Sequence, residues 1–133
     1  MVAVAISALA GLRVLVVEDE YLVAEFISMM LEDFGCDVVG PVGTIEKALA
    51  AVNDGRLDGA LLDANLSGDS SEPIAVALRA ASVPFVVATG YGALELADEA
   101  LNRAPRLSKP FSETEIKATL VAAFKRTLAD RTA

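Results

Sequence analysis

Five polar residues at four places in the chain have the types and spacing to perform phosphoryl chemistry. Each place follows a short apolar run, and the residues are Glu18, Asp19, Asp63, Thr89 and Lys109. Three of them are carboxylates, which repel one another when crowded and therefore favour a divalent cation between them. Mg²⁺ suits such a set because it takes oxygen ligands and is usually held by one or two carboxylates together with phosphate oxygens.

A carboxylate that the cation does not neutralise can attack phosphorus and form an aspartyl phosphate. Phosphoryl transfer then needs positioning and charge neutralisation. Lys109 and Mg²⁺ would neutralise phosphate oxygens, and Thr89 would donate a hydrogen bond to one of them. Simpler interpretations also exist: Asp63 as a loop cap, the acids 18–20 as a helix N-terminus, Thr89 bonded to backbone, and Lys109 at the surface.

The composition excludes other kinds of site. The 133 residues contain no histidine, which rules out His-based metal sites and histidine general bases. The formal net charge of −8 argues against nucleic acid as a direct partner. The single cysteine, Cys36, lies in an apolar run, so we expect a buried thiol in a reducing, cytoplasmic compartment. No run of about 18 apolar residues occurs, so we expect no membrane insertion.

Five short apolar segments alternate with five segments of helical spacing, and the length suggests one domain. The strands are predicted at 12–17, 36–42, 57–62, 84–88 and 106–108, and the helices over 21–34, 44–53, 73–81, 93–103 and from 112 onward. This alternation predicts an α/β fold, a doubly wound parallel sheet with helices on both faces. Ligands of such sheets bind beyond the carboxyl ends of the strands, where the five polar residues are expected to meet.

Local signals set the ends of several helices. Thr44 is expected to cap the second helix, and Ser112 with Glu115 forms a capping box at the last one. Gly35 is expected to end the first helix. The spacing in that helix predicts one buried face, with Ser28 mostly opposite. That face comprises Val23, Phe26, Ile27, Met30 and Phe34.

Two segments are expected to be irregular. Residues 1–10 are apolar but lack a basic region and are too short to span a bilayer, so we expect a loose tail. Residues 67–71 are rich in serine and glycine, and we expect a loop there.

Four short motifs, each at a predicted strand end, carry a family resemblance. They read Val-Val-Glu-Asp-Glu at 16–20, Leu-Leu-Asp at 61–63, Ala-Thr-Gly at 88–90 and Lys-Pro-Phe at 109–111. With them, the chain resembles the receiver domain of a bacterial two-component response regulator over residues 11–129. The resemblance implies a flavodoxin-like, CheY-like (βα)5 fold with strand order 2-1-3-4-5, and we expect no output domain.

The resemblance also implies roles for the acids. Asp63 would be the phosphoacceptor of a phosphoprotein, and Glu18 and Asp19 would hold Mg²⁺. Asn65 would lend its backbone carbonyl to the metal. By the same resemblance, the first helix would carry a kinase-docking surface.

The remaining implied roles concern the phosphoryl group and the conformational switch. Thr89 and Lys109 would contact the phosphoryl group, and the peptide bond before Pro110 would be cis. Typical receivers carry an aromatic switch residue three positions before the lysine, where this chain has Arg106. Tyr91 would then either take a related role, together with Thr89, or be an exposed loop tyrosine.

A narrower resemblance covers residues 84–92, which read Pro-Phe-Val-Val-Ala-Thr-Gly-Tyr-Gly. This segment is similar to the "FAT GUY" subgroup of alphaproteobacterial receivers, many of which stand alone. Val87 departs from the pattern, because the nickname has Phe at that position.

These features favour a single-domain response regulator that is not an enzyme. It would take phosphate from a sensor histidine kinase or histidine phosphotransfer protein, and then signal to a downstream protein target or act as a phosphate sink. One alternative is a Mg²⁺-dependent phosphatase that works through an aspartyl phosphate. Asn65 stands where haloacid-dehalogenase-type enzymes have a second Asp. The other alternative is a pseudo-receiver that binds a partner without phosphate.

Overall fold

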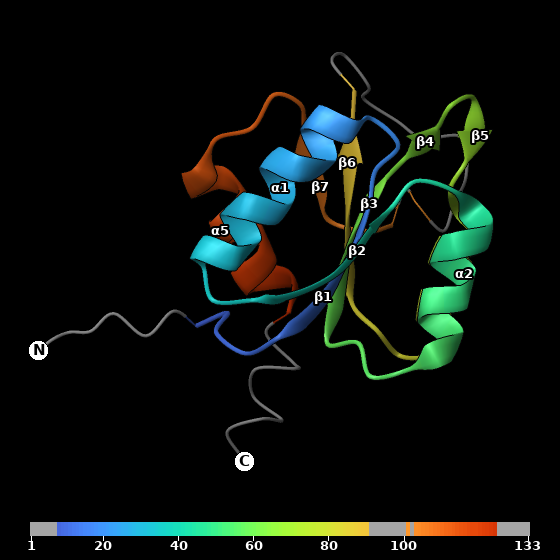
Figure 1. The fold of residues 1–133 in the computed structure, drawn as a ribbon, viewed down its shortest axis with the longest axis horizontal. Helices are drawn as coiled ribbons and strands as arrows, with labels where there is room; N and C mark the ends of the chain where they lie inside the picture. Colours follow the sequence, from blue (N-terminus) through green and yellow to red (C-terminus); the bar gives the residue numbers. More distant parts are fainter. Residues whose placement is uncertain (1–7, 91–100, 102, 125–133) are drawn as a thin grey trace, which may run out of the picture.

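A five-stranded parallel sheet runs through the middle of the molecule (Figure 1). The structure is a computed structural model that describes residues 8–90, 101 and 103–124. The strands are β1 (Arg13–Val17), β2 (Asp37–Val42), β3 (Gly59–Asp63), β6 (Phe85–Thr89) and β7 (Arg106–Ser108). Their order is β2-β1-β3-β6-β7. Because β6 and β7 are the fourth and fifth strands of this sheet along the chain, this confirms the predicted order 2-1-3-4-5. Every residue of β3 and β6 is buried, as a sheet covered on both faces requires.

Helices cover both faces of the sheet. They are α1 (Tyr21–Asp33), α2 (Ile45–Asp54), α3 (Glu72–Ala80) and α5 (Glu113–Ala123). Side chains of α1 and α5 share a core with one set of strand residues, and those of α2 and α3 share a second core with the alternate set. None of the described helices is long and apolar enough to cross a membrane. The helix expected over 93–103 falls largely outside the described residues.

The predicted helix ends are confirmed by their hydrogen bonds. Thr44 Oγ1 accepts from the backbone N–H of Lys47 at 3.1 Å. At α5, Ser112 N donates to Glu115 Oε1 at 2.9 Å, and Glu115 N donates to Ser112 Oγ at 3.1 Å, which completes the capping box. Gly35 has φ +93°, a conformation that glycine adopts at little cost, and directly follows the C-cap of α1.

The buried face of α1 differs from the prediction. Ser28 is only 6% exposed, whereas Phe26 is 56% exposed, so the expected positions of these two residues were wrong. The buried face comprises Ala24, Ile27, Ser28, Met30, Leu31 and Phe34. Apolar residues surround most of this helix, so periodicity alone does not define its inner face, and packing against the sheet decides which side is covered.

The loose N-terminal tail that we expected over residues 1–10 cannot include Leu9. Leu9 is fully buried in the α1–α5 core, and Leu12 N donates to Leu9 O at 3.2 Å; residues 1–7 lie outside the described part. A Cβ atom on Gly35 would lie 3.1 Å from Ala10 Cα, so glycine at position 35 lets the segment around Ala10 pack closely against it. Cys36 is buried as expected, its Sγ lies 3.6 Å from Leu9 O, and burial raises its thiol pKa to about 11.

The expected loop at 67–71 is partly a small hairpin. The short strands β4 (Asn65–Leu66) and β5 (Asp69–Ser70) pair in antiparallel fashion. Ser67 and Gly68 form the two-residue turn between them, with φ of +53° and +95°. Positive φ at both turn positions matches the right-handed twist of hairpin strands. Strands of two residues are too short to leave a periodic signal in the sequence.

Candidate functional site

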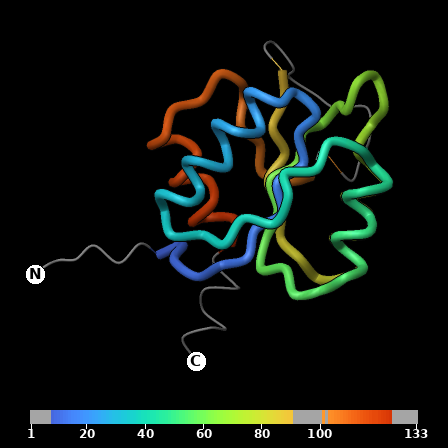
Figure 2. The backbone as a smooth tube through the Cα atoms, viewed as in Figure 1, coloured from blue at the N-terminus to red at the C-terminus, as the bar shows by residue number. Residues whose placement is uncertain are grey.

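The predicted site residues meet at one edge of the sheet. Glu18 directly follows β1, Asp63 and Thr89 are the last residues of β3 and β6, and Lys109 directly follows β7. The backbone trace shows β1, β3 and β6 ending on the same side of the molecule, at the top of the view (Figure 2). Parallel strands bring their carboxyl ends to one edge, so residues 91 positions apart become neighbours there.

Three carboxylates form the centre of this site. One carboxylate oxygen from each of Glu18, Asp19 and Asp63 lies within 4.8 Å of the others. Glu18 and Asp63 are buried, with 3% and 7% of their surface exposed. Glu20, at the N-cap of α1, makes no side-chain capping bond, but its backbone N–H donates to Glu18 Oε2 at 3.2 Å.

Lys109 supplies the positive charge. Its Nζ donates to Glu18 Oε1 at 2.8 Å and lies 3.4 Å from Asp63 Oδ2. The Lys109 side chain is only 21% exposed. The simpler interpretation, which placed Lys109 at the open surface, is therefore wrong. Its backbone N–H donates to Thr89 O at 2.9 Å, and the Lys109–Pro110 bond is cis, as the resemblance implied.

Burial and mutual repulsion perturb the titration of these groups. Burial raises the pKa of Asp63, and the negative charge of Glu18 raises it further. The hydrogen bond from the Asn65 N–H and the charge of Lys109 lower it, but less, so that the pKa is about 7. Burial alone would lower the pKa of Lys109, but its hydrogen bond to Glu18 and the charge of Asp63 raise it above the ordinary value. The ammonium therefore stays charged, and it cannot neutralise three acids by itself.

This donor set fits Mg²⁺. The clustered ligands are all carboxylate oxygens, with no imidazole or thiolate among them, and hard oxygen ligands favour magnesium over zinc. A divalent cation would also offset the repulsion that raises the pKa of Asp63. Glu18, Asp19 and Asp63 are therefore the residues that could hold it.

Thr89 has a buried hydroxyl that lacks a partner in the described part of the chain. The residue is 1% exposed, and its Oγ1 makes no hydrogen bond to any described residue, so no described backbone group holds this hydroxyl. The preceding residue, Ala88, pairs in register with Asp63, so Thr89 lies one residue beyond the acid on the neighbouring strand. A buried unpaired hydroxyl is costly, and this one is available to an oxygen that enters the site.

Asn65 and Ser67, which both follow Asp63 in the chain, make contacts that the sequence analysis did not predict. Asn65 N donates to Asp63 Oδ1 at 3.2 Å, and Asn65 Oδ1 accepts from Gly68 N at 2.8 Å. Ser67 Oγ donates a hydrogen bond to Asp19 Oδ2. No local pattern could have predicted that bond, because it joins residues 48 positions apart. The role of the Asn65 carbonyl toward a metal stays a prediction.

The predicted switch residues are less clearly placed. Arg106 is half-buried at the start of β7, where it pairs in register with Val87. Tyr91 lies outside the described residues. Their roles in a switch therefore stay predictions.

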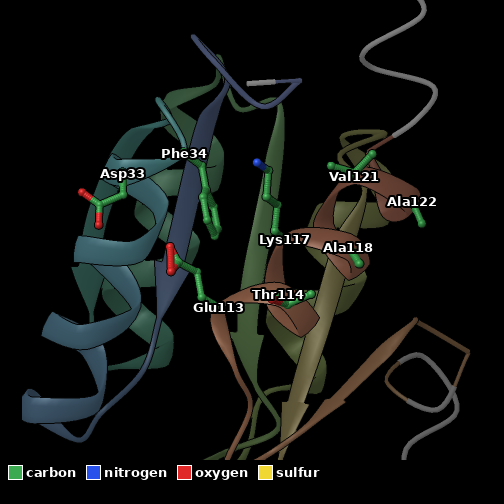
Figure 3. A pocket seen from close by; sticks show the side chains of 8 residues that line it. All are labelled: Asp33, Phe34, Glu113, Thr114, Lys117, Ala118, Val121 and Ala122. Carbon is green, nitrogen blue, oxygen red and sulfur yellow. The ribbon is translucent and has the colours of Figure 1, made fainter. Parts of the chain in front are cut away.

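A separate groove lies between the end of α1 and α5 (Figure 3). The lining residues are Asp33, Phe34, Glu113, Thr114, Lys117, Ala118, Val121 and Ala122. Lys117 Nζ lies 5.6 Å from the centroid of the Phe34 ring. None of the five predicted site residues lines this groove, so it is distinct from the acidic site.

Comparison with known families gives a match over most of the chain. The model of the response regulator receiver domain matches residues 14–121. The Sensory transduction protein LytT of Bacillus subtilis (strain 168) is 32% identical over 112 residues, which are 82% of this chain and 46% of LytT. The chain thus spans about half the length of the curated relatives it matches.

Solved structures resemble this protein over most of the chain. A solution structure of SdrG from Sphingomonas melonis Fr1 has a TM-score of 0.76 and 42% identity, over 90% of this chain and 98% of that one. SdrG in its BeF3-activated conformation has a TM-score of 0.73 and 39% identity, over 86% and 98%. The receiver domain of the sensor histidine kinase PA1611 from Pseudomonas aeruginosa PAO1 has a magnesium ion coordinated in its active site cleft. Its TM-score is 0.75 and its identity is 27%, and the match covers 87% of this chain and 99% of the PA1611 domain.

Proposed function

The chain belongs to the response regulator receiver domain family, and from this premise we propose that it accepts a phosphoryl group on Asp63 in a Mg²⁺-dependent reaction. One observation carries this proposal. A buried carboxylate, Asp63, lies 3.4 Å from an ammonium and close to two further acids, next to a strand that ends in a buried hydroxyl without a partner among the described residues. Receiver domains are signalling modules rather than enzymes in general, so stable phosphorylation is the expected outcome.

In the proposed reaction, an Asp63 carboxylate oxygen forms a bond to phosphorus. The phosphorus–nitrogen bond of a phosphohistidine donor breaks, and its electron pair leaves on the imidazole nitrogen. Glu18, Asp19, Asp63 and the Asn65 carbonyl would hold Mg²⁺, which when bound neutralises charge on the phosphoryl oxygens. The magnesium ion in the PA1611 receiver domain supports this assignment.

Lys109 and Thr89 would then bind the transferred group. Lys109 Nζ is bonded to Glu18, and it lies close enough to Asp63 to turn toward a phosphoryl oxygen. The Thr89 hydroxyl would gain the partner that it lacks among the described residues. A change in these two contacts gives the protein a preference between two arrangements, which a switch requires.

The surface of α1 supports a protein as phosphodonor. Tyr21, Leu22, Phe26 and Met29 are each more than half exposed, although they are large and apolar. Exposed apolar patches of this kind commonly mark protein interaction sites. We propose that a histidine kinase or histidine phosphotransfer protein docks there, and that the output is contact with a downstream protein. The net charge of −8 supports this over nucleic-acid binding.

A finer proposal concerns how the protein is organised in the cell. The similarity of residues 84–92 to the "FAT GUY" receivers, many of which stand alone, supports a single-domain receiver, and we propose the cytoplasm as its location. Such a protein would pass its phosphate on, drain it from a shared kinase, or bind a target when phosphorylated.

Intact-mass spectrometry after incubation with acetyl phosphate and MgCl₂ tests the phosphoacceptor. We expect one added phosphoryl group on the wild type, none on Asp63→Asn, and none when EDTA replaces the metal. Asp69→Asn, a matched change at an exposed acid in the neighbouring hairpin, should be modified like the wild type. Undiminished modification of Asp63→Asn would disprove the assignment. Rapid release of phosphate without a phosphoprotein would favour a phosphatase.

A further inference from the structure

The three clustered acids differ in what holds them. Glu18 accepts hydrogen bonds from Lys109 and from the Glu20 N–H, and Asp63 accepts from the Asn65 N–H and faces Lys109. Asp19 is held differently. Within the described part of the chain, the hydroxyl of Ser67 is the donor to its carboxylate.

The turn that carries Ser67 is anchored on both sides. Leu66, the residue before it, is 3% exposed and packs in the α2–α3 core. Across the turn, Gly68 N donates to Asn65 Oδ1 at 2.8 Å. Where the hairpin joins α3, the Ser71 hydroxyl donates to Ala64 O at 3.1 Å. The Ser67 hydroxyl is therefore presented to Asp19 from a restrained segment.

The backbone at Ser67 also limits which residue fits there. Its φ of +53° lies in the left-handed region, which serine rarely adopts and which glycine adopts at little cost. Glycine at this position would therefore be better suited to the turn but could not contact Asp19. What serine adds over glycine here is the hydrogen bond to the acid.

We infer that Ser67 is a positioning residue for Asp19, and that its hydroxyl orients this carboxylate for a divalent cation. Hydrogen bonds from an outer shell fix the orientation of ligating carboxylates, and their loss typically costs about 10–100-fold in metal affinity. The same bond ties the loop after β1 to the hairpin after β3, so the hairpin and cation binding become coupled. This inference rests on the proposed function, because it assumes that Asp19 is a Mg²⁺ ligand.

Calorimetric titration of the full chain with MgCl₂ tests this role. We expect Ser67→Gly to raise the Mg²⁺ dissociation constant about tenfold, the lower end of the range for outer-shell bonds. Ser82→Gly is the matched control: Ser82 is exposed, has φ +59°, and follows α3 away from the acids. It should bind Mg²⁺ like the wild type. In EDTA, neither glycine variant should unfold at lower urea concentration than the wild type.

A third variant separates the hydroxyl from the stability of the turn. Ser67→Thr keeps a hydroxyl but places a β-branched residue at positive φ, so it should unfold more readily in EDTA. Its Mg²⁺ affinity should nevertheless stay within about threefold of the wild type, well short of a lost outer-shell bond. If affinity instead followed stability across the three variants, Ser67 would be only structural and the inference would be wrong.

The outcomes also separate this inference from the proposed function. Unchanged or tighter Mg²⁺ binding by Ser67→Gly, with normal phosphorylation of the wild type, would overturn the role of Ser67 alone. A tenfold loss of affinity in a protein that takes no phosphate would overturn the proposed function alone. A wild type that binds no Mg²⁺ would overturn both.

Discussion

Lys109 Nζ is bonded at 2.8 Å to Glu18, a carboxylate whose side chain is only 1% exposed. Asp63, the proposed phosphoacceptor, is the more distant partner of the same ammonium, at 3.4 Å. Lys109 therefore chiefly compensates the most buried acid of the site. This arrangement leads to predictions about stability as well as about phosphorylation.

Replacing Lys109 by methionine should destabilise the metal-free protein. Glu18 would then be a buried carboxylate without a cation, and breaking a buried ion pair from one side is costly. Because the Lys109 side chain is 21% exposed, we expect a loss of about 2 kcal/mol in the free energy of unfolding, below the usual cost for fully buried pairs. Urea unfolding in EDTA measures it. Lys47→Met, on the exposed side of α2, should change stability little; equal losses in both variants would contradict the assignment.

The titration of Asp63 predicts how stability depends on pH without metal. Its pKa in the folded protein, about 7, lies above the ordinary 3.8, so the folded state holds a proton that the unfolded chain has already lost. The resulting stabilisation is complete below the ordinary pKa and is lost as the pH rises through about 7. Relative to Asp63→Asn, the wild type should therefore lose about 3 kcal/mol between about pH 5 and pH 8.

Urea unfolding of both proteins in EDTA at several pH values checks this expectation. Mg²⁺ should reduce the pH dependence of the wild type, because a bound cation lowers carboxylate pKa values. A difference between the two proteins that stays constant with pH would mean that Asp63 is ionised throughout this range.

Substitution of Thr89 should affect the activated state and spare the free protein. Thr89→Val replaces a buried hydroxyl that has no partner among the described residues by a methyl of similar shape, so the free energy of unfolding should be unchanged or higher by about 1 kcal/mol. The thermal stabilisation by beryllofluoride and Mg²⁺, which mimic the phosphoryl group on Asp63, should fall markedly. Thr89→Ser, which keeps the hydroxyl, should retain most of it. If Thr89→Val responds like the wild type, the hydroxyl does not bind the phosphoryl group.

A substitution far from the site tests the packing of α5 on the sheet. A methyl group at Gly59 would overlap the ring of Phe124, which is fully buried. Overpacking of this kind typically costs about 1–3 kcal/mol, so Gly59→Ala should lower the urea midpoint. Adding Phe124→Leu should recover part of the loss. Gly90→Ala, where a methyl group meets no atom of the described residues within 4 Å, should change stability much less.

Much of the fold and of the site could be predicted from the sequence, because the signals are local or follow from chain direction. Apolar strand runs and the Ser112–Glu115 capping box depend on neighbouring residues alone. Parallel strands bring their carboxyl ends together whatever the details of packing, so residues such as Asp63 and Lys109 could be assigned to one site. Their residue types then indicated magnesium and phosphoryl chemistry.

Only the tertiary structure decided the features that depend on contacts between distant segments. It buries Leu9 and Ser28 and exposes Phe26, because the helix surface that meets the sheet depends on packing that periodicity does not encode. It also brings Ser67 to Asp19 across 48 residues, through a hairpin too short to leave a pattern. The chemistry of the site thus follows from residue types at strand ends. The orientation of each acid depends on donors that the fold supplies.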